Sequence, residues 1–394
     1  MQNFFIMNGP LIYLLVVLFI CGAMVGSFVN VVVARLPYEK SIIWPGSRCF
    51  RCLRPIPFFF ENIPLLSYWL LGGRCKVCRA PFSMRYFFVE LLVAVGFVVL
   101  FYLEIVKNIH HIPAFDDNVN QIRFRLLTAG SLPMLWFFLH HALLYTLLVA
   151  AAFCDLEDRT IPLGITLPGT IIGLILATVF AWPWPNTLAE AMPKADPMLR
   201  VQFEDWWMLG PNQMQKAGLY PWPVWGPPPA WMPGGGPLLG LLTGLAGALT
   251  GTLMLRGVKF LFEKGLGKEA LGMGDADMMM MAGAFLGWQP IIVAFLLGAV
   301  VSLVFAVPRL IARGENTLPF GPGLAVGIVI TWLGWYWIGP QLQSLFFNAT
   351  FLAILGGLCA VVLFLMSYLI GKVQGPPKEK DGRKEGTMDK KAIH

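Results

Sequence analysis

Long apolar runs divide this chain and constrain its fold more than any other feature of the sequence. A helix needs about 20 apolar residues to cross a bilayer. Nine runs reach or approach that length: 11–33, 86–106, 133–153, 163–182, 238–255, 276–288, 291–307, 324–338 and 351–370. Only 13% of the 394 residues are charged, which is roughly half the share in soluble domains. The sequence therefore predicts an all-α, polytopic membrane bundle of about eight or nine spans.

Three segments interrupt this pattern. We expect residues 38–85 to form a small cytoplasmic module, because they are polar, basic and rich in proline. Residues 183–236 are rich in tryptophan, proline and glycine and predict an extracytoplasmic loop. Residues 372–394 are rich in lysine and predict a disordered tail. The helical remainder is then a first span (1–37), a group of spans at 86–182 and a second group at 237–371.

The distribution of basic residues predicts the orientation. With nine spans and the N-terminus outside, 23 of the 29 lysine and arginine residues fall on one side of the membrane. The positive-inside rule assigns that side to the cytoplasm. The first span lacks a basic n-region and a small-residue cleavage site, so we expect it to be retained.

Four cysteines in the 38–85 module predict a metal site. Two C-x2-C pairs, Cys49 with Cys52 and Cys75 with Cys78, are separated by 22 residues. This spacing is typical of a structural zinc held by four thiolates. Two disulfides are the alternative, which a reducing cytoplasm disfavours. A module of this size is too small for a good core, so a metal would help to hold it together.

Two aspartates at helix ends predict the reactive site. Asp275 follows Gly272 and Gly274 in a G-x-G-D sequence that opens an apolar run, and Asp155 ends another run. Ionisable groups at membrane depth are costly and are functional candidates by default. The two glycines allow another backbone to approach or a positive φ. The pattern predicts an aspartyl dyad, with one carboxyl protonated and one ionised, that activates water for peptide hydrolysis.

The histidines give weaker signals. His110 and His111 lie near Asp116 and Asp117, but adjacent residues seldom bind one ion, so a solvated loop is the expectation there. Of His140 and His141 in the third span, we expect one to face the bundle and to bond a neighbour. No Ser–His pair or His-Glu-x-x-His sequence competes with the aspartates.

The order of the motifs resembles the bacterial type IV prepilin peptidases, the leader peptidase/N-methyltransferase family of intramembrane aspartyl proteases. Besides the cysteine pairs, the matching stretches are GSFVNVVVARLP (26–37), ENIPLLSYWLLGGRC (61–75), APFSMRYFFVELL (80–92), DLEDRTIP (155–162), GKEALGMGDADM (267–278) and PFGPGLAVG (319–327). Together they cover most of the chain outside residues 183–236.

The resemblance implies an activity and its partners. Asp155 and Asp275 match the family's two catalytic aspartates. The implied substrates are prepilins or pseudopilins of pili and type II secretion, cut on the cytoplasmic side of the inner membrane. Many members then methylate the new N-terminus with S-adenosylmethionine, although the sequence shows no recognisable loop for that cofactor. Membrane lipid is an expected partner, and nucleic acid is not.

The sequence departs from the family in three places. Asp277 stands where the family usually has lysine, two residues after the second aspartate. We expect Asp277 to lie in the first turn of its helix, where negative charge meets the positive end of the helix dipole, or to pair with a basic residue of the 256–268 loop. The 183–236 loop is unusually long, and the ninth span and the tail are additions.

Two other functions remain open from the sequence. One is another G-x-G-D protease, of the presenilin or preflagellin type. The other is a catalytically silent, zinc-bearing membrane scaffold. The cysteine module and the GSFVNV stretch count against the first of these.

Overall fold

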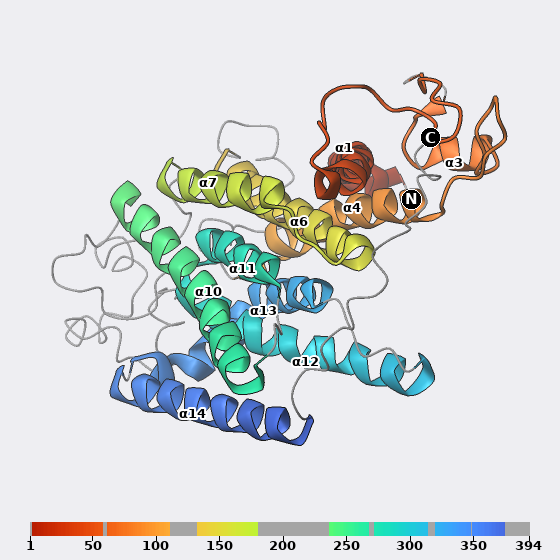
Figure 1. The fold of residues 1–394 in the computed structure, drawn as a ribbon. Helices are drawn as coiled ribbons and strands as arrows, with labels where there is room; N and C mark the ends of the chain where they lie inside the picture. Colours follow the sequence, from red (N-terminus) through yellow and green to blue (C-terminus); the bar gives the residue numbers. More distant parts are fainter. Residues whose placement is uncertain are drawn as a thin grey trace, which may run out of the picture. The chain divides into compact units, whose positions relative to one another are not determined.

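The structure, a computed structural model, describes residues 2–57, 61–110, 132–179, 236–267, 272–313, 320–347 and 349–374. These residues are predominantly helical, and isolated bridges but no β-strand occur among them. The long helices (Figure 1) are α1 (Gln2–Arg35), α4 (Arg85–Phe101), α6 (Leu132–Asp158), α7 (Leu163–Val179), α10 (Gly236–Leu266), α11 (Met273–Leu286), α12 (Trp288–Arg313), α13 (Gly321–Phe347) and α14 (Ala349–Gln374).

Each predicted span corresponds to one of these helices. Six helices in the described part of the chain are long and apolar enough to cross a membrane, and two shorter apolar ones are Leu163–Val179 and Trp288–Val304. The expected all-α membrane bundle is therefore confirmed, and the protein is a multi-pass membrane protein. Most of the predicted 183–236 loop, the residues His111, Asp116 and Asp117, and the tail beyond residue 374 lie outside the described residues.

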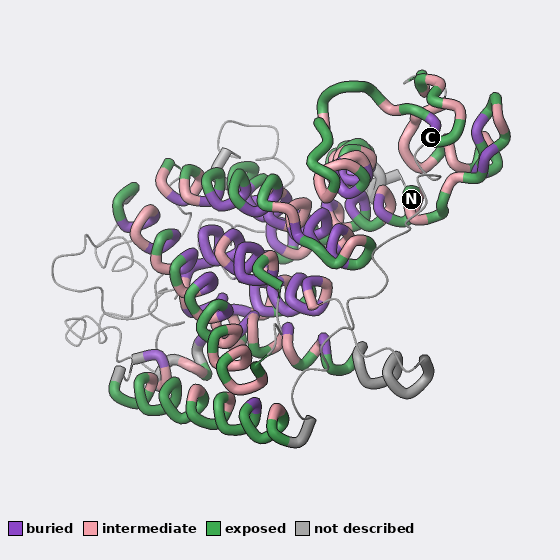
Figure 2. Tube along the Cα trace, viewed as in Figure 1, coloured by how far each residue is buried: buried purple, intermediate pink, exposed green. Residues whose placement is uncertain are grey.

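The chain forms two compact units. Unit 1 comprises Met1–Leu255 and Gly272–Ala349, and unit 2 comprises Arg256–Leu271 and Thr350–His394. In unit 2, Ser367 of α14 is buried, and its hydroxyl donates to the carbonyl of Leu261 at 3.4 Å. Most other side chains of α14 are exposed (Figure 2). An apolar helix with this exposure suits contact with lipid.

In unit 1, α1 packs tightly along α4. A Cβ atom at Gly22 would lie 2.7 Å from Cα of Ala94, and one at Gly26 would lie 2.7 Å from Cα of Glu90. Small residues let two membrane helices approach this closely. The glycine of the GSFVN stretch therefore positions α1 against the segment of α4 that carries Glu90.

Helix α11 forms the centre of unit 1. Nearly all of its residues from Asp275 to Leu286 are buried, as its colour in Figure 2 shows. Glycines of α10 pack against its backbone: a Cβ atom at Gly247 or Gly251 would overlap the carbonyl of Gly283 or Met279. The 14-residue helix is too short to span a bilayer by itself. The protein packed around this helix accounts for its short length.

A buried polar cluster lies between α6, α13 and the short π-helix η2 (Tyr102–Val106). The Trp332 indole donates to Oε1 of Glu104 at 2.8 Å. Nδ1 of His141 lies 2.8 Å from the same oxygen, and Nε2 of His110 lies 3.3 Å from it. Both histidines are therefore buried around one carboxyl group, and the expectation of a solvated loop at His110 was wrong. These partners surround Oε1, whereas Oε2 of Glu104 is buried without a hydrogen-bond partner among the described residues.

Candidate active site and metal centre

Asp155 lies in the last turn of α6, 7% exposed. Its Oδ2 accepts a hydrogen bond from the backbone N–H of Gly321, at 2.8 Å, where α13 begins. The first N–H groups of a helix lack partners within it, and the helix dipole favours negative charge there. Gly321 leaves no room for a side chain, because a Cβ atom would lie 2.8 Å from Oδ2 of Asp155.

Asp275 lies in the first turn of α11 and is 8% exposed. Gly274, the residue before it, packs against Ile161 in the turn that follows α6, so the start of α11 lies beside the end of α6 that carries Asp155. Three helix ends thus meet around this pair: the C-terminal end of α6 and the N-terminal ends of α11 and α13. The structure brings together the two aspartates that the sequence analysis singled out from positions 120 residues apart.

The two glycines of the G-x-G-D sequence have different surroundings. A Cβ atom at Gly274 would lie 2.8 Å from Cβ of Ile161 and 3.1 Å from its backbone N and O. Gly274 therefore allows the close approach that the sequence predicted. Gly272 has φ −67° and ψ 149°, which any residue adopts, and a Cβ atom there would come no nearer than 3.9 Å to Oδ2 of Asp275. Neither a close backbone approach nor a positive φ, the two predicted reasons for glycine, is found at Gly272.

Asp277 does not occupy the position that helix-end chemistry predicted. It is the fifth residue of α11, beyond the first turn, and only Asp275 lies in that turn. Asp277 is buried, at 6% exposure, and it has interaction partners. The expected role in stabilising the helix dipole was therefore wrong. α11 is a regular α-helix here, so Asp277 lies about 200° around the axis from Asp275.

Two aspartates so placed can share one proton. Two adjacent carboxylates cannot both hold a charge in a medium of low dielectric constant, so one remains protonated. The ionised partner can take a proton from water while the protonated one donates a hydrogen bond to a carbonyl oxygen. The N–H of Gly321 favours charge on Asp155.

The end of α6 also contacts the N-terminal part of the chain. The Tyr38 hydroxyl donates to Oδ1 of Asp158 at 2.8 Å. Arg85, the first residue of α4, pairs with Glu157. Leu36 packs beside Gly164 at the start of α7. The cysteine module therefore lies at the same end of unit 1 as the aspartates.

The four cysteines of the module are arranged so that they could hold one metal ion. Their ligand atoms all lie within 4.8 Å of one another. Sγ of Cys49 lies 3.6 Å from that of Cys78, and Sγ of Cys52 lies 3.9 Å from that of Cys75. Zinc–sulfur bonds of about 2.3 Å place the sulfurs of a tetrahedron roughly 3.8 Å apart. All four cysteines are free thiols in the structure. The donor set therefore fits zinc.

The two C-x2-C pairs lie in separate backbone turns of the same kind. The N–H of Leu53 donates to the carbonyl of Cys49 at 3.0 Å, and that of Arg79 donates to Cys75 at 3.0 Å. Leu53 and Arg79 have φ values of 55° and 56°. The N–H groups of Cys78 and Val77 point at the sulfur of Cys75 and lower its pKa to about 6. A lowered thiol pKa favours the thiolate that binds a metal.

Purified protein is expected to contain about one zinc per chain, because the four thiolates form a single closed site. Serine at Cys49 or Cys75 should remove most of this zinc and lower the stability of the module. Cys359→Ser is the matched control, because Cys359 is an exposed cysteine outside the module. Elemental analysis of the three variants checks this. Unchanged zinc in both module variants would contradict the assignment.

Three features of this region were missed from the sequence. Gly321 was noted only as part of the PFGPG stretch, although its N–H binds Asp155. Glu104 was read as part of an apolar span, although an isolated acid within such a run is itself a signal of a buried partner. Asn30 was noted only as part of the GSFVNVVVARLP stretch, although it lines a cavity described below.

Comparison with known proteins agrees with this architecture. Residues 20–103 match the bacterial peptidase A24 N-terminal domain, and residues 231–307 match the type IV leader peptidase family. No solved structure matches significantly.

Full-length relatives cover most of the chain. A prepilin leader peptidase/N-methyltransferase of Myxococcus xanthus is 30% identical over 330 residues, which are 82% of this chain and 72% of the relative. Proteins of the same name from Aeromonas salmonicida and Pseudomonas aeruginosa are 28% and 27% identical. They match over 81% and 86% of this chain and over 89% and 94% of their own lengths. By these matches, the chain belongs to the type IV leader peptidase family.

Proposed function

We propose that this protein removes the leader peptide of type IV prepilins or pseudopilins by aspartyl proteolysis and then methylates the new N-terminus. The observation that carries the proteolytic part is the pair of buried carboxyl groups, Asp155 and Asp275, where three helices end. The relatives are named for both activities. The silent-scaffold alternative leaves this carboxyl pair without a role.

In the proposed reaction, Asp155 begins as the carboxylate. The N–H of Gly321 stabilises its charge, so Asp155 takes the proton from the attacking water. Asp275 begins protonated and donates a hydrogen bond to the scissile carbonyl oxygen. The two aspartates exchange these roles when the amine leaves, because Asp155 then holds the proton that the amine needs.

We place the aspartates and the cysteine module on the cytoplasmic face of the inner membrane. The module and the end of α6 are joined by the Tyr38–Asp158 and Arg85–Glu157 contacts. The excess of basic residues on this side supports the orientation. The leader of the substrate would then be cut at the membrane surface, where the chain leaves the cytoplasm.

The direct test uses purified protein and a full-length prepilin-like substrate with a glycine before the cleavage site. N-terminal sequencing reports cleavage, and a mass increase of one methyl group reports methylation when S-adenosylmethionine is added. Absence of cleavage in detergent and in lipid nanodiscs would refute the proteolytic assignment.

Asp277→Asn is expected to retain leader cleavage within roughly tenfold of wild type, a loss of about 1.4 kcal/mol at most. Asparagine has the same shape and keeps an acceptor for the partners of this buried side chain. Asp277 also lies about 200° around α11 from Asp275. The cleavage rate of the variant checks this. A loss as complete as that of Asp275→Asn would place Asp277 in the active site.

A further inference from the structure

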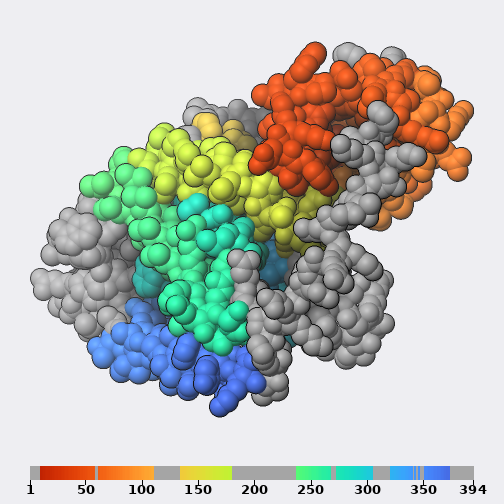
Figure 3. All heavy atoms as spheres, in the orientation of Figure 1, coloured from red at the N-terminus to blue at the C-terminus, as the bar shows by residue number. Residues whose placement is uncertain are grey.

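A cavity of about 220 Å³ lies in unit 1 between α1, α4 and the cysteine module. A single buried water needs only roughly 10–15 Å³, so the cavity can admit a larger group. Neither Asp155 nor Asp275 lines it. The module and α1, coloured red to orange in Figure 3, supply most of its wall. This cavity is therefore separate from the proposed proteolytic site.

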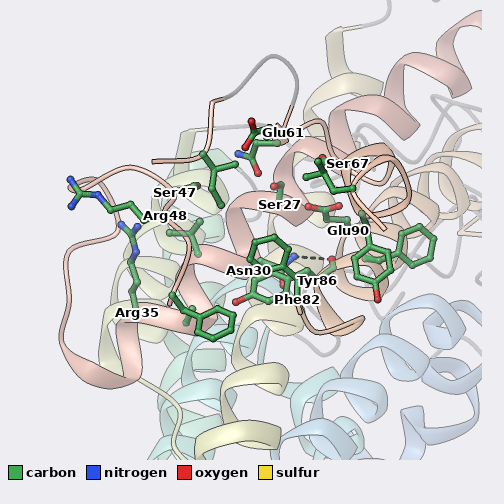
Figure 4. A pocket seen from close by; sticks show the side chains of 18 residues that line it. Ser27, Asn30, Arg35, Ser47, Arg48, Glu61, Ser67, Phe82, Tyr86 and Glu90 are labelled. Carbon is green, nitrogen blue, oxygen red and sulfur yellow. Dashed lines mark hydrogen bonds between the residues drawn. The ribbon is translucent and has the colours of Figure 1, made fainter. Parts of the chain in front are cut away.

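One wall of the cavity carries a carboxylate without a basic partner. Oε2 of Glu90 accepts from the backbone N–H of Leu65 at 2.7 Å, but no ion pair joins Glu90 to a basic side chain in the described part of the chain. Glu61, the other carboxylate in the lining, is paired with Arg54 and Lys76. Figure 4 shows Ser27 beside Glu90. Glu90 is the lining carboxylate that is left to bind a cation.

An unsatisfied acceptor lies near it. Asn30 is 3% exposed, and its Nδ2 donates to the carbonyl of Tyr86 at 2.9 Å. Its Oδ1 is buried without a hydrogen-bond partner among the described residues. Buried polar atoms of this kind call for a ligand or water. Asn30 thus offers a hydrogen-bond acceptor beside the Glu90 carboxylate (Figure 4).

Aromatic side chains complete the cavity. Tyr68, Phe82 and Phe87 are among the lining residues, and the faces of aromatic rings attract cations. The arginines of the lining do not compete for the charge of Glu90. Arg35 donates to the carbonyls of Ser41 and Gly46, and Figure 4 shows Arg35 and Arg48 extending away from Glu90.

We infer that this cavity is the methyl-transfer site, in which Glu90 and Asn30 hold the N-terminal amine of the cleaved product. The inference rests on the methyltransferase part of the proposed function. The chemistry of the lining fits a cation that bears N–H groups, as an N-terminal ammonium does, and its aromatic wall fits the sulfonium of a methyl donor. S-adenosylmethionine supplies a methyl group activated by its sulfonium sulfur.

The residues of the cavity then have defined tasks. Asn30 Oδ1 and the Glu90 carboxylate accept N–H bonds and orient the nitrogen lone pair toward the methyl carbon. A nitrogen–carbon bond forms as the carbon–sulfur bond breaks with its electron pair passing to sulfur. Before this step Glu90 takes one proton from the ammonium, because only the neutral amine has a lone pair for the methyl carbon. The contacts of Tyr38 and Arg85 with the end of α6 place this cavity and the aspartates at one end of unit 1.

The test measures binding independently of catalysis. A short fluorescent peptide with a free N-terminal phenylalanine is compared with the same peptide acetylated, each in the presence of S-adenosylhomocysteine. Wild-type protein is expected to bind the free amine roughly tenfold more tightly, because charge-assisted hydrogen bonds are lost on acetylation. Equal affinities for the two peptides in the wild type would overturn the inference without any variant.

The Glu90→Gln and Asn30→Ala variants should each lose most of the roughly tenfold preference for the free-amine peptide. Their methylation rates should fall by at least the same factor. Neither change touches the aspartyl pair, and the Glu90→Gln side chain keeps an acceptor for the Leu65 N–H. Cleavage and zinc content should therefore stay within about twofold of wild type and report correct folding. Glu39→Gln, which removes an exposed carboxylate outside the cavity, is the matched control.

The outcomes separate this inference from the function on which it rests. Variants that keep the free-amine preference and methylate at the wild-type rate overturn the assignment of the cavity, even though the protein is a methyltransferase. A wild-type protein that cleaves but never methylates refutes the methyltransferase assignment itself. Loss of amine preference and of methylation in both variants, with cleavage retained, supports the site.

Discussion

Asparagine at Asp155 or at Asp275 is expected to abolish leader cleavage, lowering the rate by on the order of 10⁴-fold, while the protein still inserts and binds zinc. Asparagine has the shape of aspartate but can neither take a proton from water nor share one with its partner. The remaining carboxyl group would keep its position against Gly321 or at the start of α11. When residues act as one catalytic unit, substituting one of them lowers the rate nearly as much as substituting all of them.

The double variant therefore should be no slower than either single variant. Quantitative cleavage assays on the three variants, with zinc content as the measure of folding, check both statements. Asp277→Asn is the matched control, since it makes the same chemical change two residues away on the same helix. Cleavage near the wild-type rate in either single variant would rule out the dyad.

The helices were predictable because lipid imposes a simple rule on this chain. Backbone polar groups must be satisfied within the span, so apolar runs of sufficient length fold as helices. The centre of nearly every predicted range falls within the corresponding helix, and the predicted and observed helices differ at their ends. The apolar run 238–255, for example, corresponds to α10, which continues to Leu266. Ends are set by extramembrane contacts, which hydropathy does not record.

The cysteine module was predictable because a tetrathiolate site leaves a regular spacing in the sequence. The cavity beside it was not, because its lining comes from α1, α4 and the loops of the module. Glu90 and Asn30 lie 60 residues apart in the sequence and line one cavity, where Gly26 lets α1 approach α4 closely. Similarly, Glu104 gains its partners from α6 and α13. Such tertiary pairs have no local pattern.

Helix geometry also has limits when it is applied to a sequence. The separation of Asp275 and Asp277 by about 200° follows from the regular helix that the structure contains. The accompanying assumption that Asp277 lies at the helix end failed, because α11 begins at Met273. Because α11 is surrounded by protein, both of its faces are buried. Asp277 is therefore buried even though it lies on the face opposite Asp275.

Gly274→Ala is expected to lower leader cleavage by on the order of 10²-fold, whereas Gly272→Ala should have little effect. A Cβ atom at position 274 would lie 2.8 Å from Cβ of Ile161 and 3.1 Å from its backbone atoms. Ile161 is buried in the turn after α6, so the start of α11 must move away from it. Displacing a catalytic group by about 1 Å can cost this much in rate.

Gly272→Ala is the matched control, because it adds the same methyl group two residues earlier in the same motif. Its Cβ atom would come only to 3.9 Å from Oδ2 of Asp275, and its backbone conformation suits alanine. Cleavage rates of the two variants, measured with equal amounts of zinc-loaded protein, distinguish the two glycines. Equal loss in both would show that the motif needs backbone freedom at Gly272, and no loss in Gly274→Ala would show that α11 can shift without moving Asp275 from Asp155.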